Sequence, residues 1–69
     1  MEEKIANRIR EFRKNSNLTQ EDLAGEMNVS RQTIISIEKG KYVPSLQLAL
    51  RIARFFRCPT DEMFGIGEE

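Results

Sequence analysis

The chain has 69 residues, of which 39% are hydrophobic and 32% are charged, a composition typical of one small folded domain. Its eleven basic and eleven acidic residues cancel, and its single cysteine excludes an internal disulfide framework. No apolar run approaches the roughly 20 residues that span a bilayer, and no signal-peptide core is present, so we expect a cytoplasmic protein without a membrane partner.

Charge is unevenly distributed along the chain. Residues 39–57 contain Lys and Arg but no acid, whereas residues 58–69 contain Asp and Glu but no base. The acidic residues of the tail are Asp61, Glu62, Glu68 and Glu69, which we interpret as a solvated end. This polarity is compatible with nucleic-acid binding through local rather than net charge.

The first expected helix runs from about Glu3 to Lys14, because Ile5, Ile9 and Phe12 recur at helical spacing. Polar residues 15–17 break it. No segment alternates at period two for long enough to predict a sheet, and the tail 64–67 could at most add a short strand.

The second expected helix begins after Thr19, whose hydroxyl is a good N-cap. Asp22 occupies the capping-box position, although its side chain is short for the reciprocal bond. Gly25 inside this helix costs about 1 kcal/mol relative to alanine, and close approach of a neighbouring helix is the expected reason. Asn28 follows at the turn, where a left-handed residue is required.

The third expected helix runs from its cap Ser30 to about Lys39 and stops at Gly40. The apolar seam shared by the second and third helices is Leu23, Ala24, Met27, Val29, Ile34 and Ile37. The opposite face of the third helix carries Arg31, Gln32, Ile35, Ser36 and Lys39. Amide and guanidinium groups on an exposed helix face can contact base edges in a DNA major groove.

The fourth expected helix runs from its cap Ser45 to about Arg57, and Thr60 caps a last short turn through Phe64. Its expected inward stripe is Leu46, Ala49, Leu50, Ala53 and Phe56. The expected dimer contact is Leu48 and Phe55 on an exposed flank, with Met63, Phe64 and Ile66; the alternative is scattered surface hydrophobes. Cys58 is expected to act as a small buried hydrophobe.

The motifs LTQEDLA, VSRQTIISIEKGK, PSLQLALRIARFF and DEMF occur in this order and spacing. Over roughly Ile5 to Phe64 the chain resembles the phage repressor/Cro (XRE-type) family. The resemblance implies an all-α, lambda-repressor-like bundle of five short helices, with the helix-turn-helix at the second and third. It also implies a single DNA-binding domain over residues 1–69, similar to the small stand-alone regulators that act as homodimers.

The resemblance also implies roles for individual residues. The base-contacting residues would be Arg31, Gln32 and Ser36, with Ile35 placed to meet thymine methyl groups. The phosphate-contacting residues would be Thr19, Gln20, Thr33, Lys39, Lys41 and Tyr42. A partly buried ion pair between Arg13 and Glu38 would orient the recognition helix.

We therefore expect a sequence-specific transcriptional regulator, a repressor, that binds a palindromic DNA operator as a homodimer. The alternative is a protein-interaction module on the same fold, a bridging factor or an antitoxin; the charge around the third helix distinguishes the two. An enzyme is disfavoured, because histidine, a Gly-rich phosphate loop and metal-spaced carboxylates are all missing from the sequence. Neither a cofactor, a metal nor a small-molecule ligand is indicated.

Overall fold

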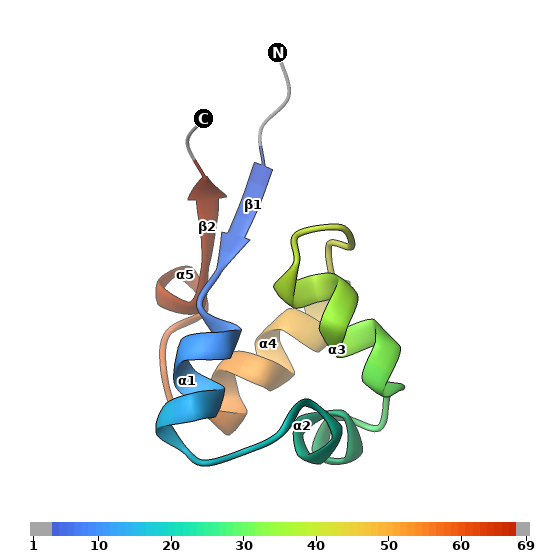
Figure 1. Ribbon diagram of the computed structural model, residues 1–69. Helices are drawn as coiled ribbons and strands as arrows, with labels where there is room; N and C mark the ends of the chain where they lie inside the picture. The colour runs from blue at the N-terminus through green and yellow to red at the C-terminus, as the bar shows by residue number, and fades with distance from the viewer. Residues whose placement is uncertain (1–3, 68–69) are drawn as a thin grey trace.

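The computed structural model describes residues 4–67. In chain order its elements are β1 (Lys4–Asn7), α1 (Ile9–Asn15), α2 (Gln20–Met27), α3 (Arg31–Glu38), α4 (Leu46–Phe55), α5 (Thr60–Met63) and β2 (Phe64–Gly67). The helices form a bundle, and β1 and β2 lie side by side and project from it (Figure 1). None of the helices in this part of the chain is long and apolar enough to cross a membrane.

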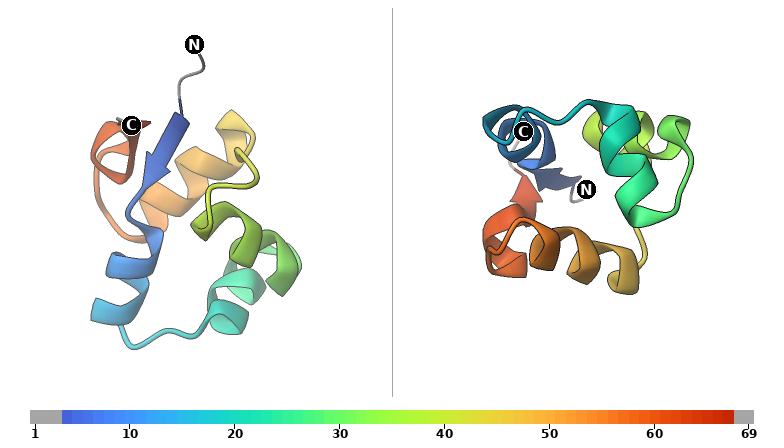
Figure 2. Two further views of the ribbon diagram at one scale, coloured as in Figure 1. Left: turned by 45° about the horizontal axis from the view of Figure 1, so that its top comes forward. Right: turned by 90° about the horizontal axis from the view of Figure 1, so that it is seen from below.

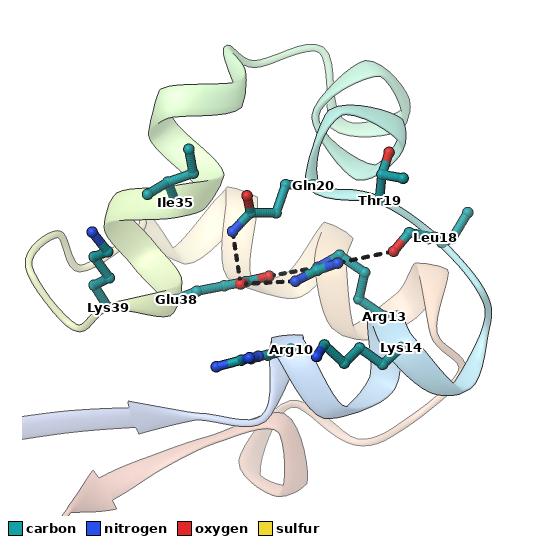
Figure 3. A pocket seen from close by; sticks show the side chains of 9 residues that line it. All are labelled: Arg10, Arg13, Lys14, Leu18, Thr19, Gln20, Ile35, Glu38 and Lys39. Carbon is teal, nitrogen blue, oxygen red and sulfur yellow. Dashed lines mark hydrogen bonds and ion pairs between the residues drawn. The ribbon is translucent and has the colours of Figure 1, made fainter.

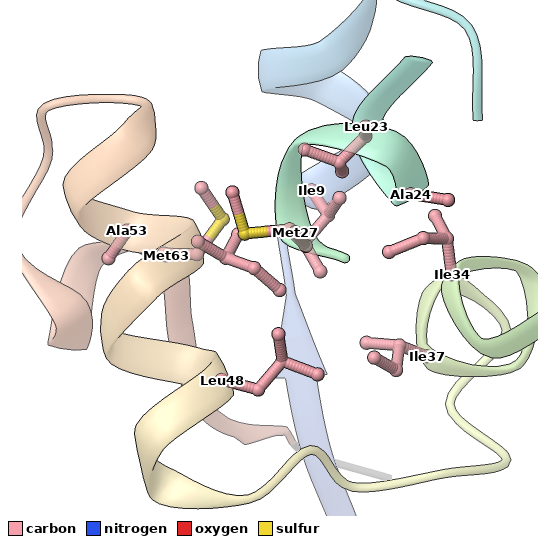
Figure 4. Packing of buried hydrophobic residues seen from close by; sticks show 10 residues of the cluster. Ile9, Leu23, Ala24, Met27, Ile34, Ile37, Leu48, Ala53 and Met63 are labelled. Carbon is pink, nitrogen blue, oxygen red and sulfur yellow. The ribbon is translucent and has the colours of Figure 1, made fainter. Parts of the chain in front are cut away.

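All five helices contribute to one apolar core (Figure 4). Its buried members are Ile9, Leu23, Ala24, Met27, Ile34, Ile37, Leu48, Ile52, Ala53 and Met63. The seam predicted between the second and third helices is confirmed, except that Val29 is only half-buried. The core fixes α3 on its inner side through Ile34 and Ile37, which leaves the outer side free.

The two-stranded sheet corrects the all-α prediction. Residues 4–7, predicted to be helical, pair antiparallel with the tail, so that Ile5 lies opposite Ile66 and Asn7 opposite Phe64. The predicted helix start, Glu3, lies outside the described residues, as do Glu68 and Glu69. The short strand allowed for residues 64–67 is confirmed as β2.

Asn7 is the physical reason why the first helix starts late. Its Oδ1 accepts a hydrogen bond from the N–H of Ile9 at 3.1 Å, which binds a free donor at the start of α1. Its Nδ2 donates to the carbonyl of Ile37 in α3 at 2.9 Å. One side chain therefore joins β1, α1 and the end of α3, and Ile5 takes part in the sheet instead of the helical stripe.

The helix-turn-helix begins with a complete capping box. The N–H of Asp22 donates to Thr19 Oγ1 at 2.9 Å, and the N–H of Thr19 donates to Asp22 Oδ2 at 3.0 Å, so the aspartate side chain is long enough after all. The turn residue Asn28 has φ +60°, as predicted. The reason expected for Gly25 is wrong, because a Cβ there would meet no atom within 4 Å.

Serine caps also start the next two helices, from Ser30 to the N–H of Thr33 and from Ser45 to the N–H of Leu48, each at 3.1 Å. Gly40, with φ +76°, follows the end of α3 as predicted. The fourth helix ends at Phe55, before the predicted Arg57, which is itself left-handed at φ +59°. Thr60 is the first residue of α5 rather than its cap.

The predicted inward stripe of the fourth helix is only partly confirmed: Ala49 and Ala53 are buried and Phe56 packs against the core, but Leu46 and Leu50 are not buried. Leu48 is only 8% exposed and belongs to the core, whereas Leu46 and Leu50 are 72% and 48% exposed. Apolar residues occur on nearly every side of this helix, so their spacing alone does not fix its phase. Packing selects the side that brings the small Ala49 and Ala53 against the core together with Leu48 and Ile52.

Two members of the predicted dimer contact are therefore excluded. Leu48 and Met63 are buried within one copy of the chain, so a second copy cannot reach them. Phe55 and Ile66 are exposed, and Phe64 is half-buried against the core. Cys58 also packs partly against the core, and burial raises the pKa of its thiol, which favours the protonated form and fits the predicted structural role.

Candidate nucleic-acid interface

The exposed face of α3 carries the polar residues expected there. Arg31, Gln32 and Lys39 are exposed, and Ile35 and Ser36 are half-buried beside them. Gln32, Ser36 and Lys39 follow one another at four- and three-residue spacing and so lie along one side of the helix. A helix with this outward side and a buried inward side is suited to entering a groove edge-on.

A hollow of about 560 Å³ lies on one side of α3, between it, α1 and the start of α2 (Figure 3). We call it the α1–α3 hollow. Its lining residues are Arg10, Arg13, Lys14, Leu18, Thr19, Gln20, Ile35, Glu38 and Lys39. It brings together three of the predicted phosphate contacts, Thr19, Gln20 and Lys39, and adds two basic residues of α1 that sequence reasoning did not identify.

An ion pair forms the floor of this hollow. Arg13 Nε lies 2.8 Å from Glu38 Oε2, and the two side chains are only 10% and 6% exposed. Arg13 Nη2 also donates to Glu38 Oε1 at 3.2 Å, and Nη1 donates to the carbonyl of Leu18 at 3.0 Å. This bidentate pair was implied by the family resemblance, and it ties the end of α3 to α1 and to the chain leading into α2.

Gln20 takes part in the same network. Its Nε2 donates to Glu38 Oε1 at 3.1 Å, so its side-chain amide is already engaged. The capping box occupies the N–H of Asp22, but the backbone N–H of Gln20, in the first turn of α2, has no intrahelical partner. Contact between Gln20 and a phosphate is therefore available through the backbone rather than through the side chain.

A second, smaller hollow of about 290 Å³ lies on the other side of α3, and we call it the loop hollow. It is lined by Ser30, Gln32, Thr33, Ser36, Lys41 and Tyr42. The N–H of Lys41 donates to the carbonyl of Ser36 at 2.9 Å, which holds the start of this loop against α3. The hydroxyls of Ser30 and Thr33 lie 2.9 Å apart and share a hydrogen bond.

The predicted site residues therefore fall into three adjoining groups. The outward side of α3 lies between the α1–α3 hollow with Lys39 and the loop hollow with Lys41. Arg31 lines neither hollow and stands exposed at the first turn of α3. Within residues 4–67, no group of three or more His, Cys, Asp or Glu side chains is placed to hold a metal ion.

Sequence reasoning missed Arg10 and Lys14, although both are visible in the sequence at a spacing of four residues. Their spacing puts them on one side of α1, next to Arg13. The sequence does not show toward which neighbouring helix this side of α1 points. The direction becomes definite only through the contact of Arg13 with Glu38, which turns this side of α1 toward α3.

Comparison with known proteins gives a consistent result. The helix-turn-helix family profile matches residues 9–63. An uncharacterized HTH-type transcriptional regulator of Methanocaldococcus jannaschii is 57% identical over 60 residues, 87% of this chain and 91% of the relative. The cryptic phage CTXphi transcriptional repressor RstR of Vibrio cholerae is 30% identical over 64 residues, 93% of this chain and 58% of the repressor.

The fold also matches a crystal structure. A Bacteroides fragilis protein to which DNA binding is ascribed superposes with a TM-score of 0.78, covering 88% of this chain and 98% of that one. The sequence identity is 24%, so this likeness shows the shared fold alone.

Proposed function

The chain belongs to the Cro/C1-type (XRE) helix-turn-helix family of DNA-binding transcriptional regulators, and we propose that it is a repressor that binds a palindromic operator as a homodimer. The observation that carries this proposal is the outward side of α3, with a cation-bearing hollow on each side of it. A DNA groove has the same arrangement, with base edges in the middle and a phosphate backbone on each side.

Arg31, Gln32 and Ser36 read the bases in this proposal. An arginine can bond guanine O6 and N7 together, and a glutamine can do the same at adenine N6 and N7. Each such pair discriminates against the wrong base by about 1–3 kcal/mol. Ile35, half-buried on the wall of the α1–α3 hollow, is placed to contact a thymine methyl group.

The phosphate contacts divide between the two hollows. Thr19, the backbone N–H of Gln20, and Lys39 face one DNA strand, and Thr33, Lys41 and Tyr42 face the other. These contacts fix the register of α3 on the duplex without reading sequence. The hydroxyl of Thr33, which shares a hydrogen bond with Ser30, orients the phosphate in this proposal. The ammonium of Lys41 supplies the positive charge.

A homodimer places two copies of α3 in successive major grooves, roughly 34 Å apart. The exposed Phe55 and Ile66 remain as members of the proposed contact, together with the half-buried Phe64. A small domain gains from such an association, since one core of this size supplies only a few kcal/mol of stability. Sedimentation at increasing protein concentration tests the dimer, and an Ile66→Ser variant is expected to weaken it.

The protein-interaction alternative differs in the charge that it needs beside α3. Four cations and one carboxylate line the α1–α3 hollow, which favours a polyanion over an apolar partner surface. Repression by an operator-bound protein requires only that it occupy the promoter, and the named role of RstR agrees with this choice.

Selection from a random DNA library, followed by gel shift, tests the function. We expect one enriched palindromic site. Arg31→Ala is expected to relax one base preference, while Lys41→Ala weakens all sequences alike and flattens the salt dependence. Identical behaviour of the two variants would contradict the division of roles, and failure to bind any DNA at about 50 mM salt would remove the proposal altogether.

A further inference from the structure

Three cations of the α1–α3 hollow have no ion-pair partner within residues 4–67. Arg10 and Lys14 lie along its α1 side and Lys39 on its α3 side (Figure 3). All three are exposed, and none of the three takes part in an ion pair with another residue between 4 and 67. In a chain of zero net charge, three unpaired cations around one hollow call for an anionic partner.

The carboxylate in the hollow does not supply that partner. Glu38 accepts from Arg13 at both oxygens and from Gln20, so its charge is already compensated. The pair is nearly buried, whereas Arg10 and Lys14 remain on the surface above it. The uncompensated charge at the rim of the hollow is therefore positive. It is carried by the long side chains of Arg10 and Lys14, which can reach an anion bound beside α1.

We infer that α1 provides a DNA-backbone contact of its own, with Arg10 and Lys14 binding phosphodiester oxygens beside the one that Thr19 and Gln20 approach. This inference rests on the proposed function. When α3 lies in the major groove, the sugar-phosphate backbone at the groove edge runs past the helix that precedes it. The same hollow joins that helix start to α1, so the strand continues directly onto Arg10 and Lys14.

The double variant Arg10→Gln/Lys14→Gln tests the contact with a short duplex of random sequence. Each lost phosphate contact reduces the slope of log K against log salt by about 0.9. Between about 50 and 200 mM salt, the wild type should therefore lose about twelve-fold more affinity than the double variant. The charge-conserving variant Arg10→Lys/Lys14→Arg should keep the wild-type slope and shows that a change is due to charge rather than to folding.

The matched control is Arg54→Gln/Arg57→Gln, which removes one exposed cation in the last turn of α4 and another just after this helix. It changes the net charge equally but should leave the salt slope unchanged. Equal slopes for the two double variants would overturn the inference, because the effect would then belong to overall charge. Absence of DNA binding by the wild type would instead remove the proposed function.

Arg10 and Lys14 could bind the phosphate oxygens of either DNA or free inorganic phosphate, because the two ligands present the same oxyanion. At equal ionic strength, inorganic phosphate should shift the amide signal of Gln20 in NMR spectra much less than the duplex does. Tighter binding of the free ion would overturn the assignment to a DNA backbone.

Discussion

The buried pair between Arg13 and Glu38 gives the sharpest test of how α3 is held. In Arg13→Met the carboxylate of Glu38, 6% exposed, keeps only the amide of Gln20, and the carbonyl of Leu18 loses a donor. Removing one partner of a buried pair costs about 3–5 kcal/mol, because an uncompensated charge stays in the interior. A domain of this size has about 3–10 kcal/mol in total, so the variant is expected to lose a large part of its stability.

Urea denaturation followed by circular dichroism measures this loss. With a slope near 1 kcal/mol per molar, the midpoint should fall by about 3–5 M. The double variant Arg13→Met/Glu38→Leu should recover most of the loss, since apolar replacement of a buried pair is close to neutral. The control is Glu11→Gln, whose partner Arg8 is 45% exposed, and it should change the free energy of unfolding very little because solvent screens this pair. A cost for Arg13→Met as small as that of the control would refute the reasoning.

The remaining predictions concern the backbone and the caps. Gly25→Ala should raise the free energy of unfolding by about 0.5–1 kcal/mol in thermal melts, because the site is helical and has open space for a Cβ. Asn28→Ala should lower it by about 1–2 kcal/mol at φ +60°, whereas Asn28→Gly should not. Asn7→Ala, which removes both hydrogen bonds from β1 to the helices, should lower it by about 1–3 kcal/mol and speed amide exchange at the start of α1. The N–H of Thr19 lowers the pKa of Asp22 below 3.8, so its contribution is present above that pH and lost as pH falls through the lowered pKa; Asp22→Asn should flatten this acid-side dependence in urea titrations.

The caps and turns could be predicted because their chemistry is local. Thr19, Ser30 and Ser45 cap the helices they precede through a hydrogen bond to a residue three positions later, and Asn28 adopts the left-handed conformation where it was expected. Each of these requires only a few neighbouring residues. The pattern of polar and apolar residues over α2 and α3 likewise determined which side of each helix is buried.

The sheet and the phase of α4 could not be predicted because they depend on distant contacts. Residues 4–7 become a strand only when residues 64–67 lie beside them. For α4, the polar positions Gln47, Arg51 and Arg54 recur at helical spacing and mark an outward side opposite Ile52. Using the polar positions rather than the leucines would have corrected the stripe and removed Leu48 from the expected dimer contact.

The candidate site shows the same division. The outward residues of α3 and the pair Arg13–Glu38 came from the resemblance, which aligns a motif whose geometry is constant. The resemblance assigns no role to Arg10 and Lys14, and the role that we propose for them rests on the orientation of α1 given by the contact of Arg13 with Glu38. A motif therefore predicts which helix is the candidate for reading bases, but the cations that surround this helix can be identified only from the packed structure.

Zero net charge does not prevent this domain from binding DNA, because binding depends on the charges near α3. Three of its acids, Glu11, Glu38 and Glu62, are paired with arginines. Glu11 and Glu62 both pair with Arg8, at 3.0 and 3.8 Å. Glu38 pairs with Arg13 and is nearly buried, so its negative charge is compensated before a phosphate approaches. Salt screens exposed charges beyond about 8–10 Å, so a phosphate at α3 responds to the cations beside it rather than to the molecular total. The salt dependence of binding should therefore follow the number of local phosphate contacts. Replacing Glu11 or Glu62, the partners of Arg8, by glutamine should alter this salt dependence far less than replacing a lysine beside α3 by glutamine.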